Sequence, residues 1–314
     1  MRKQFVLVVL TVALLGLTGR AWTAEPLVNV DWVKANIGKP GIVFLDVRGE
    51  GRTDYTRAHI PGAVFSDYVK DGWRVKDKNG TVAMLPEPAA VEKLVGSLGI
   101  DNKTHVVIVP TGGNALDMGT AARIYWTFKV MGHDNVSILD GGWFAYAAVD
   151  EKTRKPLNPL QSGNVAPGAK TFKASPRREM ILTKEDVKKA AAAGKVTLVD
   201  NRPNDFFVGV TKAGPAKKPG TIPGSKNVPE SWITENNGGK LRDKATLAKL
   251  YAAVGVPTSG DSINFCNTGH WASLGWFASH EILGNKKAKM YDGSMVEWSA
   301  DPSLPIEVKI NAAK

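Results

Sequence analysis

Short apolar runs alternate along the chain with longer stretches in which apolar residues recur at helical spacing. The runs are rich in β-branched residues, which predicts strands that are buried on both faces. Strands that alternate with helices predict parallel sheets flanked by helices on both faces, an α/β fold. The predicted strands are 42–47, 106–109, 136–139, 196–199 and 262–265, and the predicted helices are 87–98, 118–131, 184–193, 244–254 and 272–283.

The same order of features occurs twice. Residues 42–48 and residues 196–202 both contain an apolar run that ends in Asp-x-Arg, and each is followed by Ile-Pro-Gly. The offset of about 150 residues is much longer than a solenoid repeat and predicts a duplicated domain. We expect a first domain at 25–150 and a second at 178–314, joined by a proline-containing, semi-rigid linker at 151–177.

Composition agrees with two globular domains. The chain has 314 residues, of which 43% are hydrophobic, so each half can close a core of its own. A charged fraction of 23% with scattered Gly and Pro excludes collagen, a coiled coil and a disordered tail. The net charge of +11 could attract small anions, anionic lipid or nucleic acid. Because no basic and aromatic platform accompanies the charge, we expect no nucleic-acid partner.

The N-terminus has the pattern of a secretory signal peptide. Arg2 and Lys3 precede an apolar run at 5–17 that is short for a membrane span. We expect a signal peptide at 1–24 that is cleaved after Ala24, with Ala21 as the alternative site and an uncleaved anchor as the alternative interpretation. Cleavage after Ala24 would lower the net charge from +11 to +8. The mature protein would then be periplasmic or secreted, without a stable membrane anchor.

Cys266 is the one cysteine of the chain, so no intramolecular disulfide can form. It follows the strand 262–265 and precedes the helix predicted at 272–283. A strand, a tight loop and a helix N-terminus aim backbone N–H groups at one point and favour the thiolate form of a cysteine there. An inert buried cysteine is the alternative. We predict a nucleophile at Cys266, with an anion-binding loop made of Asn267, Thr268, Gly269, His270, Trp271 and Ala272.

Several segments together resemble the tandem-domain rhodanese family of sulfurtransferases. The resemblance implies two rhodanese-like domains and a persulfide on Cys266, and no cofactor. A small anionic sulfur donor such as thiosulfate would load the cysteine, and cyanide or a thiol would accept the sulfur. The first domain would be catalytically silent, because Pro110 ends its strand 106–109. The segments that carry the resemblance are 45–48, 59–63, 121–126, 131–133, 139–142, 199–202, 222–224, 291–294 and 297–298.

The donor stays open between thiosulfate and 3-mercaptopyruvate. The loop lacks the basic residues that follow the cysteine in thiosulfate enzymes, and it also lacks the Cys-Gly-Ser-Gly of mercaptopyruvate enzymes. An arginine that the family places a few residues beyond Arg202 falls on Phe206. Positive charge for the donor could instead come from His270, from Lys212, Lys217 and Lys218, or from Arg48, Arg52 and Arg57.

Other polar residues are expected to be structural. Asp46 and Arg48, and likewise Asp200 and Arg202, should form ion pairs at strand ends. The five histidines lack metal-ligand spacing, so no metal site is predicted. A cysteine phosphatase would need an arginine where Ala272 stands. A sulfur carrier that does not turn over remains open beside the enzyme.

Overall fold

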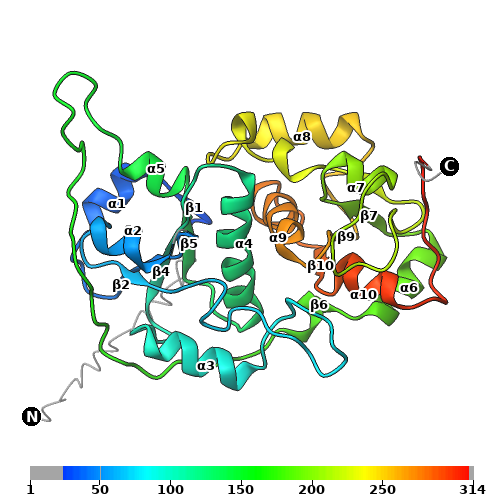
Figure 1. Ribbon diagram of the computed structural model, residues 1–314, viewed down its shortest axis with the longest axis horizontal. Coiled ribbons are helices and arrows are strands. Elements are labelled where there is room, and N and C mark those ends of the chain that lie inside the picture. The colour runs from blue at the N-terminus through cyan, green and yellow to red at the C-terminus, as the bar shows by residue number, and fades with distance from the viewer. Residues whose placement is uncertain (1–23, 50, 311–314) are drawn as a thin grey trace, which may run out of the picture.

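The computed structural model describes residues 24–49 and 51–310, which form two α/β domains side by side (Figure 1). Residues 1–23, almost all of the predicted signal peptide, lie outside the described residues. Within the described ranges, no helix has the length and apolar character needed to cross a membrane.

Each domain contains a five-stranded sheet in which every pair of neighbours is parallel, as the alternating pattern predicts. The strand orders, β1-β5-β4-β2-β3 and β6-β10-β9-β7-β8, follow one plan, which agrees with the predicted duplication. The first sheet consists of β1 (Leu27–Val28), β2 (Ile42–Asp46), β3 (Val64–Phe65), β4 (His105–Val109) and β5 (Val136–Leu139). The second consists of β6 (Ile181–Leu182), β7 (Thr197–Asp200), β8 (Lys226–Asn227), β9 (Ser262–Phe265) and β10 (Ala288–Tyr291).

Helices follow most of the strands, and they include the five that the sequence predicts. In the first domain they are α1 (Val30–Asn36), α2 (Arg52–Arg57), α3 (Pro88–Ser97), α4 (Ala115–Val130) and α5 (Gly142–Tyr146). In the second they are η1 (Arg178–Met180), α6 (Lys184–Ala193), α7 (Asn204–Val208), η2 (Glu230–Trp232), η3 (Glu235–Asn237), α8 (Lys244–Ala253), α9 (His270–Phe277), η4 (Ala278–Ile282) and α10 (Ser294–Ala300).

Two predicted helices differ from the observed ones at their ends. Helix α4 begins three residues before the predicted start, because the Asn114 side chain accepts a hydrogen bond from the Asp117 amide and caps it. The helix predicted at 272–283 begins at His270 and changes after Phe277 into the π-helical turn η4. A π-helical turn has no distinct sequence period, so the pattern alone could not show it.

Alternate residues of the strands face opposite sides of each sheet, and both sides are covered. In β4, Val107 and Val109 pack in a cluster with Val33 of α1, whereas Val106 and Ile108 face the side covered by α3 and α4. This two-residue alternation within a continuous apolar run is the reason why the strand is buried on both faces.

The inner faces of the two domains share a hydrophobic core. Helices α4 and α9 lie side by side (Figure 1), and the Tyr125 ring meets the Phe277 ring edge-on, with 4.9 Å between centroids. One cluster of buried side chains runs from α3 and α4 through α9 to α8. The separate cores expected from composition are therefore joined, because the helices that cover the two inner sheet faces also cover each other.

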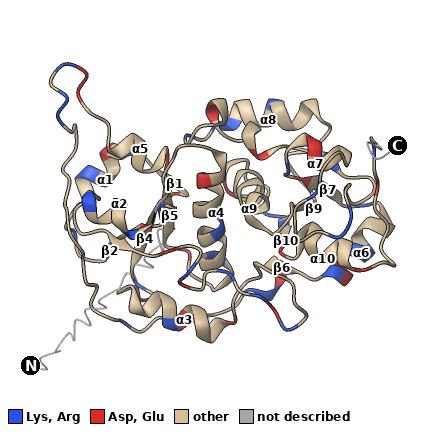
Figure 2. Ribbon diagram, in the orientation of Figure 1, with Lys and Arg blue, Asp and Glu red and all other residues tan. Residues whose placement is uncertain are grey.

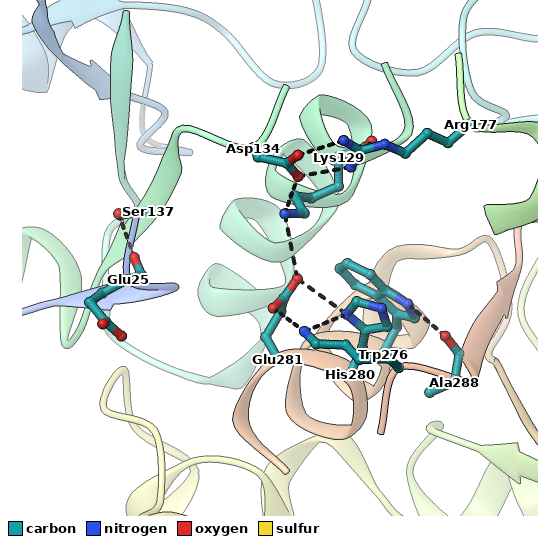
Figure 3. Close-up of polar contacts among 10 residues, drawn as sticks. Glu25, Lys129, Asp134, Ser137, Arg177, Trp276, His280, Glu281 and Ala288 are labelled. Carbon is teal, nitrogen blue, oxygen red and sulfur yellow. Dashed lines mark hydrogen bonds and ion pairs between the residues drawn. The ribbon is translucent and has the colours of Figure 1, made fainter. Parts of the chain in front are cut away.

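A polar network closes one end of this interface (Figure 3). Lys129 of α4 forms an ion pair with Asp134 and lies 4.0 Å from Glu281 of η4. Arg177, at the end of the linker, also pairs with Asp134. The Nδ1 of His280 lies 3.2 Å from Oε1 of Glu281. These contacts join the linker to both domains.

The segment between the two domains lies against the first domain. Its backbone amides at Gly163, Lys170 and Ser175 donate to carbonyls of Thr56, Gly96 and Met131. Its Phe172 side chain is buried against Phe128. These hydrogen bonds and the packing of Phe172 hold the linker in one conformation, although its sequence has no regular periodicity.

Candidate active site

Cys266 lines a cavity of about 440 Å³ between the two domains. The residue directly follows β9, so the parallel sheet places it at the carboxyl edge where α/β proteins bind ligands. Its side chain is 0% exposed and also touches the shared hydrophobic core, yet it lines the cavity. The cavity is lined by Val47, Gly49, Asp67, Tyr68, Val69, Arg74, Leu116, Asp117 and Thr120 of the first domain, and by Ala213, Cys266, Asn267, Thr268, His270 and Trp271 of the second.

The loop after Cys266 turns into the N-terminus of α9. Gly269 has φ +73°, a left-handed conformation that glycine adopts without strain. The Ser273 amide donates to the Gly269 carbonyl at 3.3 Å, so the amides of His270, Trp271 and Ala272 precede the first bond of the helix. These groups and the helix dipole favour an anion in front of α9.

Ser294 holds the loop through hydrogen bonds of its side chain. Its Oγ accepts hydrogen bonds from the amides of Cys266 at 3.1 Å and Gly269 at 3.2 Å, and it donates to the Tyr291 carbonyl at 2.9 Å. The amide of Gly269, which the sequence assigned to the anion-binding loop, is therefore engaged by Ser294, and Gly269 serves the turn instead. The sequence analysis placed Ser294 in a repeated segment but not at the cysteine loop.

The first domain braces the same loop through a buried ion pair. Arg123 of α4, which is 0% exposed, pairs with Asp292, and its Nη1 lies 3.5 Å from the Gly269 carbonyl. The second carboxylate oxygen of Asp292 accepts from the Leu85 amide at 2.7 Å. Burial opposes the charge of Arg123, but Asp292 outweighs it, so the pKa of Arg123 is raised. Contacts from both domains therefore hold the loop.

His270 is held as a neutral side chain. Burial, together with the nearby Arg74, lowers its pKa to about 3. Its Nε2 lies 2.9 Å from the Leu116 carbonyl and therefore donates, which leaves Nδ1 to accept from the Tyr68 hydroxyl at 3.0 Å. The expectation that His270 could supply positive charge is wrong, because burial and the nearby Arg74 keep its ring unprotonated.

The other predicted cations do not line the cavity. Lys212 donates to the Ala216 carbonyl at 3.0 Å, and the side chains of Lys217 and Lys218 are exposed. Arg48 is paired with Asp46 at 2.8 Å. Arg52 bonds Asn164, and Arg57 pairs with Asp54 on the surface.

Arg74 lines the cavity and was not among the predicted site residues. It stands on an irregular segment after β3, without a motif that could have marked it. Its distance of 192 residues from Cys266 also hides the relation in the sequence.

The ion pair expected between Asp200 and Arg202 is present, at 2.6 Å, and Arg202 also contacts the loop that follows Cys266. The Nη1 of Arg202 lies 3.4 Å from the side-chain oxygen of Asn267. Phe206, which stands where the resemblance called for an arginine, meets the Trp271 ring at 6.1 Å between centroids. That position therefore supports the cavity wall rather than a charge.

The first domain has the matching loop without the thiol. Pro110 follows β4 as Cys266 follows β9, and the Trp143 amide donates to its carbonyl at 2.8 Å. In the second domain the Met295 amide makes the same contact with Cys266, at 3.0 Å. A side chain without a nucleophile thus stands at the first-domain site.

Among residues 24–49 and 51–310, no group of three or more His, Cys, Asp and Glu side chains could hold a metal.

The chain is thus a tandem-domain protein with two repeated parallel α/β domains, and Cys266 of the second domain lines the cavity between them. Both halves match the Rhodanese-like domain, over residues 29–149 and 183–301, and the chain belongs to the rhodanese family. The predicted fold of two rhodanese-like domains is confirmed.

Curated relatives cover nearly the whole chain. "Putative thiosulfate sulfurtransferase 1" of Mycobacterium bovis is 35% identical over 90% of this chain and 98% of its own length. "Putative thiosulfate sulfurtransferase" of Mycolicibacterium smegmatis is 33% identical over 91% of this chain and 98% of its own length. The family and these relatives support sulfurtransferase activity.

Solved structures show the same architecture. The 3-mercaptopyruvate sulfurtransferase SseA of Escherichia coli has a TM-score of 0.72 at 25% identity, covering 86% of this chain and 99% of that chain. An anaerobic ergothioneine biosynthesis enzyme from Chlorobium limicola has a TM-score of 0.75 at 19% identity, covering 91% of this chain and 71% of that chain, a likeness of fold alone.

Proposed function

We propose that the protein is an exported thiosulfate sulfurtransferase in which Cys266 carries the transferred sulfur. The observation that carries the proposal is the position of this one cysteine, which lines an interdomain cavity and lies on the loop that leads into the N-terminus of α9. Thiosulfate is favoured as the donor by the names of relatives that align with 90% of the chain.

The reaction has two steps. The Cys266 thiolate attacks the outer sulfur of thiosulfate, the S–S bond of the donor breaks, and sulfite leaves with the bonding electron pair. The sulfur remains as a cysteine persulfide, which is an anion at its terminal atom. Cyanide or a thiolate then attacks that atom, the new S–S bond breaks, and the Cys266 thiolate is regenerated. Such covalent catalysis shows ping-pong kinetics.

The described residues suit the anionic intermediate. The amides of His270, Trp271 and Ala272 lie at the start of α9, and together with the helix dipole they would stabilise the persulfide as an oxyanion hole stabilises oxygen. The Tyr68 hydroxyl donates to His270, which is neutral, and so holds the side chain of the loop's first helical residue. Ala272 is buried where a cysteine phosphatase would need its arginine.

Intact mass spectrometry of the purified protein tests the proposal. Incubation with thiosulfate should add one sulfur atom, and added cyanide should remove it with formation of thiocyanate. Cys266→Ser and Cys266→Ala should keep the wild-type circular dichroism and take up no sulfur. Sulfur uptake by either variant would exclude Cys266 as the carrier.

The same assay separates the alternatives. Faster loading from 3-mercaptopyruvate than from thiosulfate would assign the other donor, which the similarity to the Escherichia coli enzyme makes the second candidate. Loading to one sulfur per chain without catalytic turnover would instead identify a sulfur carrier.

Export and small-molecule partners complete the proposal. The N-terminal apolar run favours a periplasmic or secreted protein that keeps no membrane anchor after cleavage. Figure 2 shows basic positions in both domains, interspersed with acidic ones, which favours small anions over nucleic acid as partners. N-terminal sequencing of the mature protein should begin at Glu25.

A further inference from the structure

We propose that Arg74, which belongs to the domain without a cysteine, binds the anionic end of the sulfur donor. The inference rests on the proposed function and names its donor-binding residue. Among the described residues, Arg74 is the one Lys or Arg side chain that lines the cavity containing Cys266. A donor whose outer sulfur reaches Cys266 would therefore direct its sulfonate or carboxylate group toward the first domain.

Arg74 is held in place although it lies outside any helix or strand. Its guanidinium carbon lies 4.5 Å from the ring centroid of Tyr68, in a cation–π contact. The preceding residue, Trp73, is buried and bonds Ser66 at 2.9 Å through its indole N–H. The following residue, Val75, exchanges two backbone hydrogen bonds with Met84. The guanidinium is thus pre-organised at the cavity wall.

The guanidinium of Arg74 also keeps its hydrogen-bonding groups available. Within residues 24–49 and 51–310, neither an ion pair nor a hydrogen bond involves the Arg74 side chain, whereas the buried Arg48, Arg123 and Arg202 each have a carboxylate partner. An arginine presents five N–H donors in a planar fork that matches the two oxygens of a carboxylate or a sulfonate.

Two carboxylates also line the cavity, and both are bonded to the backbone. Asp67 accepts from the amides of Val69 and Lys70, at 2.9 and 3.1 Å. Asp117 accepts from the amide of Gly113 at 2.8 Å. These contacts hold the Asp67 and Asp117 carboxylates in loop and cap structure. Much of the remaining lining is apolar or aromatic, which strengthens the attraction between Arg74 and an anion.

The charge of Arg74 acts on His270, in the loop region that follows Cys266. It is one of the causes that lower the pKa of His270, next to burial. His270 is the first residue of α9 and also lines the cavity. Arg74 and the N-terminus of α9 therefore act on the same cavity from opposite domains, and a dianionic donor such as thiosulfate can contact both.

The rate of sulfur loading tests this role. We would mix Arg74→Met, Arg74→Lys and wild type with thiosulfate and, in a second series, with 3-mercaptopyruvate, and follow persulfide formation on Cys266 by intact mass. Loss of a charge-assisted bidentate contact should slow loading of Arg74→Met about 10- to 100-fold. Arg74→Lys should be intermediate, because it keeps the charge without the fork. The series with the larger effect identifies which anionic group Arg74 binds.

Two controls separate binding from structure. Lys78→Met removes an exposed cation of the same segment that does not line the cavity, and it should load at the wild-type rate. Protein preloaded at high donor concentration should pass its sulfur to uncharged dithiothreitol equally fast with and without Arg74. Wild-type loading by Arg74→Met with both donors, or a discharge slowed as much as the loading, would overturn the role of Arg74. If wild type itself takes up no sulfur from either donor, the proposed function fails instead.

Discussion

Replacing Gly269 by alanine would test how rigidly the first domain holds the cysteine loop. At φ +73° an added Cβ would lie 2.8 Å from Oδ1 and 3.0 Å from the carbonyl oxygen of Asp292, and it would also collide with Arg123. The left-handed conformation costs alanine about 1 to 2 kcal/mol. Separating a buried ion pair costs roughly a further 3 to 5 kcal/mol, since Arg123 is 0% and Asp292 3% exposed.

Gly284→Ala is the matched control. Gly284 has φ +85°, but a Cβ there would meet nothing within 4 Å, so this variant has only the backbone strain of about 1 to 2 kcal/mol. Urea unfolding followed by tryptophan fluorescence should show Gly269→Ala about 3 kcal/mol less stable than Gly284→Ala. Sulfur loading on Cys266 should also be lost in Gly269→Ala alone. Equal stability of the two variants would refute the reasoning, because it would mean that Arg123 and Asp292 can move away from the added Cβ without a loss of free energy of unfolding.

Two further predictions follow from burial and exposure. Burial raises the pKa of Glu230 to about 7, so the folded state loses stability as pH rises from about 4.5 to 7. Glu230→Gln removes that charge. At pH 8 its free energy of unfolding, measured with urea, should therefore exceed that of wild type by about 1 to 3 kcal/mol, and at pH 4.5 the two should be similar. The rate of sulfur loading of Lys217→Ala and of Lys218→Ala should be within about twofold of wild type, since both side chains are exposed and neither lines the cavity. A tenfold slower rate in the mass assay would show that these lysines take part in donor binding.

Most central strands and the longer helices were predictable because each has its own signal. The central strand β10 was not predicted, because its sequence Ala-Lys-Met-Tyr contains no β-branched run. The strand at 106–109 is a run of β-branched residues, and α6 was predicted with its observed bounds, Lys184–Ala193. The edge strands β1, β3, β6 and β8 were not predicted, because two residues are too few to show a period. The register of β3 comes from its neighbour, where Val64 lies opposite Leu45. An edge of that kind is decided by the sheet rather than by the sequence of the strand.

The candidate site divides in the same way. Cys266 and the loop up to Ala272 lie within seven consecutive residues, so the chain itself states the order of strand, thiol and helix. Ser294, Arg123 and Arg74 belong to distant segments, and only folding brings them to that loop. The cations proposed from the sequence came from segments of both domains, but the sequence does not show which of these side chains face the cavity.

The amino-acid sequence by itself determined the repeated α/β plan, the unpaired cysteine and the peptide geometry in front of it, because these depend on neighbouring residues and on local periodicity. The tertiary structure decided that the two domains share one core and that His270 is neutral. It also placed the guanidinium of Arg74 in the wall of the cavity. Those properties depend on which surfaces are buried against each other. The packing of α4 against α9 determines this burial, and neither segment determines it alone.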